Sequence, residues 1–435
     1  MMTTGKTIVL LFLVFIILGS LSIYRHKNIP ANTFRSELWV DKAGYYVYLP
    51  STILYHFQTE KFPEKIDSLE GNGFSLSSGK VVTKYTYGVA LLELPFFICA
   101  DFLTTLFDYP KDGFSLLYRK VINIAAAFYL TLGLYLLFLS LKVHYNYNFL
   151  TLFITLLILF FGTNLYYYGI MDTGMSHVYS FFLFSSILYL VTHKGKYNNK
   201  YTYNIFLSLL IWFIILIRPT NIIFALIPFI WSATSLREIV LNIRCLISVK
   251  ILIIWVLTFF VIFTPQFIYW KYAFGHYFVY SYMNEGFSNF LSPRFAELLF
   301  SPNNGLLPYS LIFIGIFCSF FLLFNKNSIS IFYQLFTFLL ICYLTTSWHE
   351  RGFGCGAGMR NMVEYYSLFA FPLCFFINKV CSIKIKSFRF SMYLCIGLLV
   401  LISFKVNYHY YGCYFEDTWN WTQYINTLTY PVKLI

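Results

Sequence analysis

Twelve apolar segments divide this sequence and limit its fold more than any other feature. Each is long enough to cross or enter a bilayer, whose hydrocarbon core of about 30 Å takes a helix of about 20 residues. A chain in lipid must satisfy its backbone hydrogen bonds internally, so such segments are expected to be helices. Only 11% of the 435 residues are charged, against about 25% in soluble domains. We therefore predict an all-α, polytopic transmembrane helical bundle with segments near 7–24, 87–107, 118–141, 149–168, 176–192, 203–217, 219–233, 250–270, 307–324, 330–347, 365–381 and 390–406.

The basic residues indicate how the chain is oriented. Those behind the net charge of +13 fall in short clusters between apolar segments, which is typical of cytoplasmic loops and not of a nucleic-acid-binding surface. The clusters lie at 193–202, 234–250, 325–329 and 382–389. If these are cytoplasmic, the other side of the membrane holds nearly every unusual polar residue, in 165–175, around 218, and in 271–306, 348–364 and 407–435.

The first segment and the loop after it set the number of crossings. Segment 7–24 follows Lys6 and lacks a small-residue cleavage site, so we expect a retained signal anchor whose amino end is cytoplasmic. The loop 25–86 is then exterior, as is 165–175, and three full spans cannot connect them. One of 87–107, 118–141 and 149–168 must be partial, and we favour 149–168. This gives about eleven full spans plus one partial span in a membrane domain of residues 1–406, followed by a short exterior tail, 407–435.

Asp41 is the most distinctive residue of the first exterior loop. It precedes an aromatic stretch that contains Tyr45, Tyr46 and Tyr48 and ends at Pro50. A carboxylate at a bilayer surface can deprotonate an acceptor hydroxyl or amine, or hold a divalent cation against a phosphate. The alternative is a solvated loop aspartate. The loop itself is expected to hold short interfacial helices, because aromatic side chains suit the headgroup zone; these are Tyr45, Tyr46, Tyr48, Tyr55 and Phe57.

Several polar residues interrupt or enter the apolar segments. Asp172 and His177 lie where a helical stretch breaks at glycines, which favours a cavity over a lipid-facing kink. Arg218, before Pro219, separates two short apolar halves, and its planar fork suits phosphate oxygens unless it marks the tip of a surface hairpin. Lys84 enters the second segment, where it can meet a lipid phosphate or simply extend to the membrane surface.

Two later exterior loops combine aromatic, charged and glycine residues. In 271–306, Glu285 lies among aromatic residues that can form a sugar-stacking wall or an interfacial belt. In 348–364, Trp348 and His349 precede a glycine-rich run that ends with Arg360 and Glu364 at i,i+4 spacing. Such a run lets backbone amides approach an anion, or it is a flexible loop. The nine cysteines form no metal-binding motif, and only Cys355 and Cys413 suggest a disulfide.

Taken in order, these motifs resemble the GT-C class of integral membrane glycosyltransferases, in the group related to protein mannosyltransferases and aminoarabinose transferases. The resemblance runs from about residue 7 to 375. It implies a GT-C-like fold, with Asp41 as the catalytic base or beside it and a sugar delivered on a polyprenyl phosphate. The chain departs from the pattern at Asp41, which has no Asp-Glu or Asp-x-Asp pair, and at Cys355-Gly-Ala-Gly, where relatives more often carry Ser-Phe-Gly. The matching elements are the Asp41 loop, Lys84 to Phe96, Asp172, Arg218 to Asn221, Glu285 to Phe287, Leu299 to Leu306, Trp348 to Arg360, and Glu364.

The expected protein is a bacterial inner-membrane hexosyl- or pentosyltransferase with its active site facing the periplasm. Its donor is a polyprenyl-phosphate-linked sugar, its acceptor is a lipid, glycan or protein, and nucleic acid is not a partner. Asp41 is the expected catalytic residue, and Arg218, Arg360 and Lys84 are expected to bind the donor phosphate. No cofactor is certain, although Asp41, Asp172 and His177 are candidates for a divalent metal ion. The expected substrate-binding residues are Tyr45, Tyr46, Asp172, His177, Glu285, Trp348, His349 and Glu364.

Two other functions remain open at this point. A transporter or flippase of lipid-linked saccharides would share the membrane fold, although the sequence has no repeat of the kind that transporters often carry. A ligase that transfers a preassembled glycan would share the donor chemistry.

Overall fold

The apolar segments form helices in the computed structural model, which describes residues 4–231, 233, 235–244, 248–283, 285–324, 329–350, 356–410 and 420–430. In these residues, seven helices are long and apolar enough to cross a membrane, and five shorter apolar helices accompany them. The prediction of an all-α polytopic bundle is confirmed, while the number of crossings stays a prediction. The long helices are α1 (Thr4–Arg25), α5 (Gly88–Leu106), α6 (Leu116–Tyr145), α10 (Lys200–Ile217), α13 (Val249–Phe274), α17 (Ile329–Ser347) and α19 (Lys386–Tyr408).

The shorter helices include the segment that we favoured as the partial span. Helix α7 has 13 residues and ends before Gly162, so it is too short to cross a hydrocarbon core of about 30 Å by itself. The remaining elements of the bundle and its loops are α7 (Phe149–Phe161), α8 (Leu165–Ile170), α9 (Ser176–Thr192), η2 (Lys194–Lys196), η3 (Pro219–Leu226), α11 (Ile227–Ile230), α12 (Leu236–Arg244), α14 (Phe295–Phe300), α15 (Leu306–Tyr309), α16 (Phe313–Phe324), η5 (Arg360–Met362), α18 (Tyr366–Cys381) and α20 (Trp421–Thr429).

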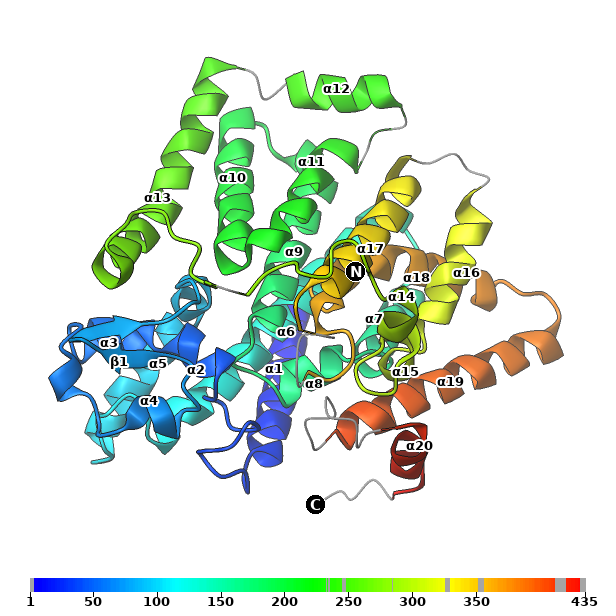
Figure 1. Cartoon of the computed structure of the whole chain (residues 1–435). Coiled ribbons are helices and arrows are strands. Elements are labelled where there is room, and N and C mark those ends of the chain that lie inside the picture. Colours follow the sequence, from blue (N-terminus) through cyan, green and yellow to red (C-terminus); the bar gives the residue numbers. More distant parts are fainter. Residues whose placement is uncertain are drawn as a thin grey trace.

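Helices α6 and α9 form the centre of the bundle (Figure 1). Helix α6 packs against α1, α5 and α9, while α9 also contacts α10 and α18; α10 packs on α13, and α18 on α7 and α16. Several of the largest fully buried side chains are tyrosines rather than aliphatic residues, among them Tyr118, Tyr166 and Tyr179. The outer helices expose apolar side chains, such as Phe260 and Val261 on α13, which is expected of surfaces that face lipid.

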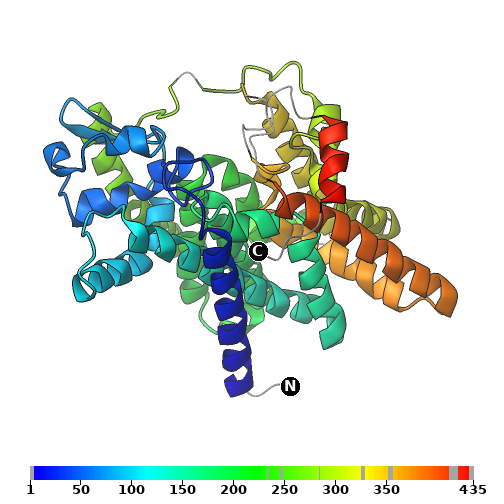
Figure 2. The same cartoon turned by 90° about the horizontal axis from the view of Figure 1, so that it is seen from below.

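The two ends of the bundle differ in character. Helix α12, which lies in the basic region 234–250, crosses the end where α10 and α13 begin (Figure 1). At the other end, α10 stops at Arg218 and α13 stops at Gly275, near the first exterior loop. Figure 2 shows α1 extending away from this loop-rich end, with the amino terminus at its far end. The arrangement agrees with the charge pattern, which separated basic loops from loops with unusual polar residues.

The loop 25–86 contains the short helices that were expected and a hairpin that was not. Its helices are α2 (Asp41–Tyr46), α3 (Tyr48–Ile53), η1 (Thr59–Lys61) and α4 (Ile66–Leu69). The antiparallel strands β1 (Ser75–Ser77) and β2 (Lys80–Val82) pair Ser75 with Val82, Leu76 with Val81 and Ser77 with Lys80. Gly79, at the turn, has a positive φ of 69°, which glycine adopts without steric cost.

That the short helices lie along the membrane interface stays a prediction, but the tyrosines of the loop face the protein interior rather than the headgroup zone. Tyr45, Tyr46 and Tyr48 are buried, and α2 and α3 pack against α5. The hydroxyl of Tyr48 donates to the carbonyl oxygen of Tyr85 at 2.6 Å, and that of Tyr46 also donates to a backbone carbonyl. Internal acceptors therefore replace water, which allows these amphipathic side chains to lie in the interior.

The approach of Gly73 to α2 leads to a stability prediction. A Cβ at residue 73 would lie 1.8 Å from the carbonyl oxygen of Val40, so the backbone before Asp41 would have to move. Gly73→Ala is expected to lower the unfolding free energy by about 1–3 kcal/mol, as overpacking does, and to lower the Tm measured in detergent. Gly195→Ala is the matched control, because a Cβ there has open space. A Gly73→Ala protein with the wild-type Tm would contradict this close packing.

Candidate functional site

A cavity of about 240 Å³ lies at the loop-rich end of the bundle. Its lining comes from seven stretches of the chain, all within or beside the regions that the charge pattern placed on the exterior. Nine of the expected site residues line it, including Asp41, the proposed catalytic residue. The lining consists of Asp41, Tyr45, Lys84, Tyr85, Met175, Ser176, His177, Arg218, Pro219, Thr220, Ile223, Tyr280, Tyr282, Glu285, Phe287, Ile341, Leu344, Thr345, Trp348, Glu350, Arg360, Asn361, Glu364 and Tyr365.

Asp41 is the first residue of α2, and its side chain is one-quarter exposed to the cavity. Its Oδ1 accepts a short hydrogen bond from the hydroxyl of Tyr85, and its Oδ2 lies 3.6 Å from Nη1 of Arg360. Burial and the neighbouring carboxylate both raise the pKa of Tyr85, so this hydroxyl keeps its proton and acts as a donor. Burial would lower the pKa of Arg360, but Asp41 and nearby tyrosines raise it overall. Asp41 therefore faces a hydroxyl donor on one side and a guanidinium group on the other.

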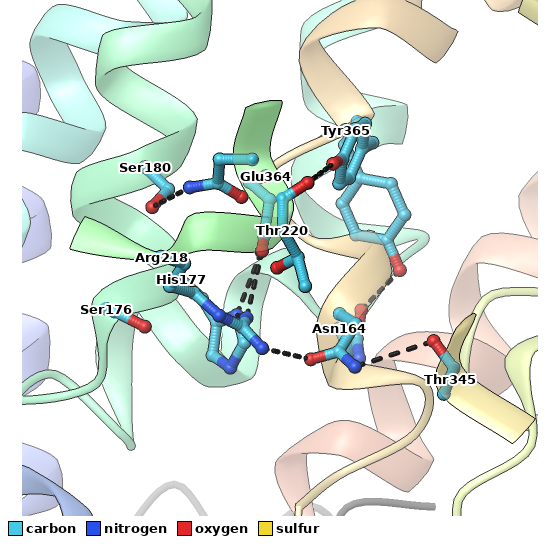
Figure 3. Close-up of polar contacts among 12 residues, drawn as sticks. Asn164, Ser176, His177, Ser180, Arg218, Thr220, Thr345, Glu364 and Tyr365 are labelled. Atoms are coloured by element: carbon cyan, nitrogen blue, oxygen red, sulfur yellow. Dashed lines mark hydrogen bonds and ion pairs between the residues drawn. The ribbon is translucent and has the colours of Figure 1, made fainter. Parts of the chain in front are cut away.

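Arg218, which also lines the cavity, is held in a second polar network (Figure 3). It follows the last residue of α10 and has an extended backbone, as expected for a residue before proline. Its Nη1 lies 3.0 Å from Oε1 of Glu364, and its Nη2 donates to Oδ1 of Asn361 at 2.7 Å. The other carboxylate oxygen of Glu364 lies 2.9 Å from Nδ1 of His177. One buried carboxylate thus orients both an arginine and an imidazole at the cavity.

Lys84 and a group of aromatic side chains form the third part of the site. The Nζ of Lys84 lies 2.6 Å from Oε1 of Glu285. Rings follow one another along this side of the cavity, with centroid distances of 4.3 Å for Tyr45–Tyr85, 6.1 Å for Tyr85–Tyr282, 6.0 Å for Tyr282–Trp348 and 5.1 Å for Phe287–Trp348. Rings beside a carboxylate and an ammonium group can stack on a sugar and bond its hydroxyls.

Three expected substrate-binding residues lie outside the cavity lining. Tyr46 is fully buried against Phe97, with ring centroids 5.9 Å apart. Asp172 forms an ion pair with Lys42, at 2.8 Å from Nζ to Oδ1. His349 is exposed, and its backbone N–H bonds the carbonyl oxygen of Gly286 at 2.8 Å. Their roles as substrate contacts are therefore not supported by the geometry.

The three metal candidates do not share a binding position. Asp41 contacts Tyr85, while Asp172 pairs with Lys42 and His177 with Glu364. Among the described residues, no three His, Cys, Asp or Glu side chains gather as a metal-binding group. The glycine-rich stretch 351–355 and the residues 411–419, and with them the pair Cys355 and Cys413, lie outside the described residues.

Two partners of the expected residues were missed by the sequence analysis. Tyr85, which donates to Asp41, follows Lys84 in the element from Lys84 to Phe96. Asn361, which bonds Arg218, follows Arg360. Adjacency to a candidate residue was the only signal in the sequence, because neither residue type is unusual in such a loop.

Comparison with known proteins identifies solved structures with a similar chain path, and two of them are described here. One is the archaeal oligosaccharyltransferase AglB from Archaeoglobus fulgidus in complex with an inhibitory peptide and a dolichol-phosphate: 12% identity, 92% of this chain and 56% of that chain covered, TM-score 0.48. The other is an A. fulgidus oligosaccharyltransferase tethered to an acceptor peptide: 11% identity, 91% and 54% covered, TM-score 0.47.

Both solved structures are oligosaccharyltransferases. The chain spans about half of the length of these enzymes. No protein-family model matches the sequence, and neither does any curated protein. At these TM-scores the likeness assigns no activity, so a function must be argued from the site residues themselves.

Proposed function

We propose that this protein is a membrane glycosyltransferase that takes its sugar from a polyprenyl-phosphate donor. The observation that carries the proposal is the lining of one cavity, which combines four carboxylates, three cationic side chains and an aromatic wall. This combination provides a proton acceptor, partners for a phosphate and a surface for a sugar ring. A donor that arrives from the bilayer also needs no nucleotide-binding domain.

Arg218, Arg360 and Lys84 are the proposed partners of the donor phosphate. Each faces a carboxylate, Glu364, Asp41 and Glu285 respectively. An incoming phosphate can share these cations, and the forked guanidinium groups suit its oxygens. The charge that develops on the leaving phosphate would then meet donors that are already oriented, which is the most effective form of electrostatic stabilisation.

The apolar part of the cavity supports a lipid-linked donor. Ile223 on η3, together with Ile341 and Leu344 on α17, lines the cavity beside the polar groups. The hydroxyl of Tyr333 bonds the carbonyl oxygen of Ile223 at 2.7 Å, which ties η3 to α17. We propose that the first isoprene units of the donor lie along this apolar flank, with the phosphate directed toward Arg218.

Asp41 is the proposed general base. The acceptor oxygen or nitrogen forms a bond to the anomeric carbon of the sugar while its proton passes to Asp41. The bond from that carbon to the phosphate oxygen breaks, and its electron pair leaves with the polyprenyl phosphate. Because a sugar phosphate ester is already activated, positioning and charge stabilisation would supply most of the rate.

The proposed location is the inner membrane of a bacterium, with the cavity on the periplasmic side. Its support is the separation of the cavity from the basic regions, such as α12, that lie toward the opposite end of the bundle. The acceptor is proposed to be a hydroxyl or amine group on a lipid, glycan or protein.

The test is a transfer assay with purified protein in detergent. A panel of polyprenyl-phosphate sugars, radiolabelled in the sugar, is supplied with a membrane glycolipid extract as acceptor. Release of free polyprenyl phosphate together with label in the acceptor is the expected result. Absence of release, combined with movement of labelled lipid-linked saccharide across proteoliposome membranes, would replace the proposal with a flippase.

A further inference from the structure

A buried ion pair lies directly behind the residue that we propose as the base. Lys42 follows Asp41 on α2, and its Nζ lies 2.8 Å from Oδ1 of Asp172. Their side chains are 4% and 16% exposed, and neither lines the cavity. The ammonium group also donates to the carbonyl oxygen of Phe34 at 3.0 Å. This pair therefore does not contact a substrate in the cavity, although its lysine is adjacent in sequence to Asp41.

Asp172 lies in the tight turn that leads into α9. Its carbonyl oxygen accepts a hydrogen bond from the N–H of Met175 at 3.2 Å, and the next residues, Ser176 and His177, line the cavity. A second contact joins the same two segments, because the hydroxyl of Tyr45 on α2 bonds Oγ of Ser176 at 3.3 Å. Helix α2 and the segment that leads into α9 are thus linked by an ion pair and by a hydrogen bond.

Close packing leaves little freedom between these segments. A Cβ at residue 174 would lie 2.6 Å from the carbonyl oxygen of Glu37 and 3.0 Å from Cβ of Lys42. Val40, immediately before Asp41, has a φ of 48°, which is rare for a β-branched residue and is maintained only when the surroundings impose it. Its N–H bonds the carbonyl oxygen of Glu70 at 2.9 Å. Contacts outside the cavity therefore hold the backbone that carries Asp41.

We propose that the Lys42–Asp172 pair positions Asp41 relative to the network of His177, Glu364 and Arg218. Asp41 belongs to α2, whereas His177 begins α9, and the pair connects those two elements. Displacing a reacting group by about 1 Å can cost about 100-fold in rate. The expected loss of transfer rate rests on the proposed function, whereas the structural link between α2 and α9 does not. Asp172, a candidate substrate or metal ligand by sequence, becomes a positioning residue.

The kinetic test compares Lys42→Met, Asp172→Asn and the double variant with wild type. Each single variant leaves one buried charge without its partner and is expected to be less stable. The double variant removes both charges, so its Tm should recover toward wild type. Its kcat should nevertheless remain about 10- to 100-fold low, with the KM for the donor within about twofold. Lys42→Arg, which keeps the charge, should restore part of the kcat.

The matched control is Lys111→Met, which removes a half-exposed lysine whose partner Asp101 lies 3.0 Å away. Its kcat and KM should equal those of wild type. A double variant that recovers both Tm and kcat would reduce the pair to a structural role and overturn the proposal.

A second readout does not depend on catalysis. Amide hydrogen exchange, followed by mass spectrometry, is measured for peptides that cover α2. The amides of 41–48 should exchange faster in Lys42→Met and in the double variant than in wild type or Lys111→Met. If wild type transfers no sugar, the proposed function fails, yet this measurement still tests the link between α2 and α9. Exchange of α2 at the wild-type rate in the double variant would contradict the link.

Discussion

Asp41→Asn is expected to lower the kcat of sugar transfer by about 10²- to 10⁴-fold, the range typical of a lost general base. Asparagine keeps the size of the side chain, and its amide oxygen can still accept the hydrogen bond from Tyr85. It cannot take a proton from the acceptor. The cations proposed to bind the donor phosphate stay in place, and Arg360 loses a competing carboxylate, so the KM for the donor should not rise. Initial rates at saturating and limiting donor concentration separate the two parameters.

The matched control for this change is Asp108→Asn. Asp108 is exposed, lies outside the cavity lining and has a positive φ of 55°, which asparagine tolerates well. It should transfer sugar at the wild-type rate. Equal kcat in Asp41→Asn and wild type would remove Asp41 from the chemistry, whatever the activity of the protein.

Glu364→Gln is expected to have the largest combined effect on stability and turnover. The carboxylate is buried and contacts both Arg218 and His177, so its replacement leaves a mostly buried guanidinium without a counter-charge. Breaking a buried ion pair in this way typically costs about 3–5 kcal/mol. We expect a clear fall in Tm and, since Arg218 loses its orientation, a kcat reduced by at least about 10-fold. Asp41→Asn should reduce kcat with a smaller fall in Tm, because Arg360 lies 3.6 Å from Asp41 whereas Arg218 lies 3.0 Å from Glu364. The two variants therefore have different signatures.

Glu297→Gln provides the comparison for a carboxylate outside the site. Its partner Arg294 lies 3.4 Å away, and both side chains are about half exposed. Exposed pairs contribute about 0–1 kcal/mol, so this variant should match wild type in Tm and rate. If Glu364→Gln had the same Tm and rate as Glu297→Gln, the network around Arg218 would contribute neither to stability nor to turnover.

The sequence predicted the helical bundle because hydrophobic length alone limits a chain in lipid to helices. It also predicted that Asp41, Arg218 and Arg360 belong to one site, since an arginine such as Arg218 between two short apolar spans is costly unless it meets an anion. These residues lie far apart in the sequence, but the charge pattern placed their loops on the same side of the membrane.

The sequence did not reveal which charged groups pair with one another. Arg360 and Glu364 have the i,i+4 spacing of a helical ion pair, yet Arg360 faces Asp41 and Glu364 faces Arg218. The 3₁₀ geometry of η5 changes the directions of these side chains. Asp172 was misjudged for a related reason, because its partner Lys42 lies more than a hundred residues away and periodicity carries no information about such contacts.

The pairing of each cavity cation with a carboxylate has a consequence for how the enzyme would turn over. A polyprenyl phosphate product carries more negative charge than the diester donor from which it is formed, so bare arginines would hold the product more tightly than the substrate. Glu364 and Asp41 compete for the same guanidinium groups. After transfer, these carboxylates would pair with the arginines again and displace the polyprenyl phosphate product, so that the site can bind another donor.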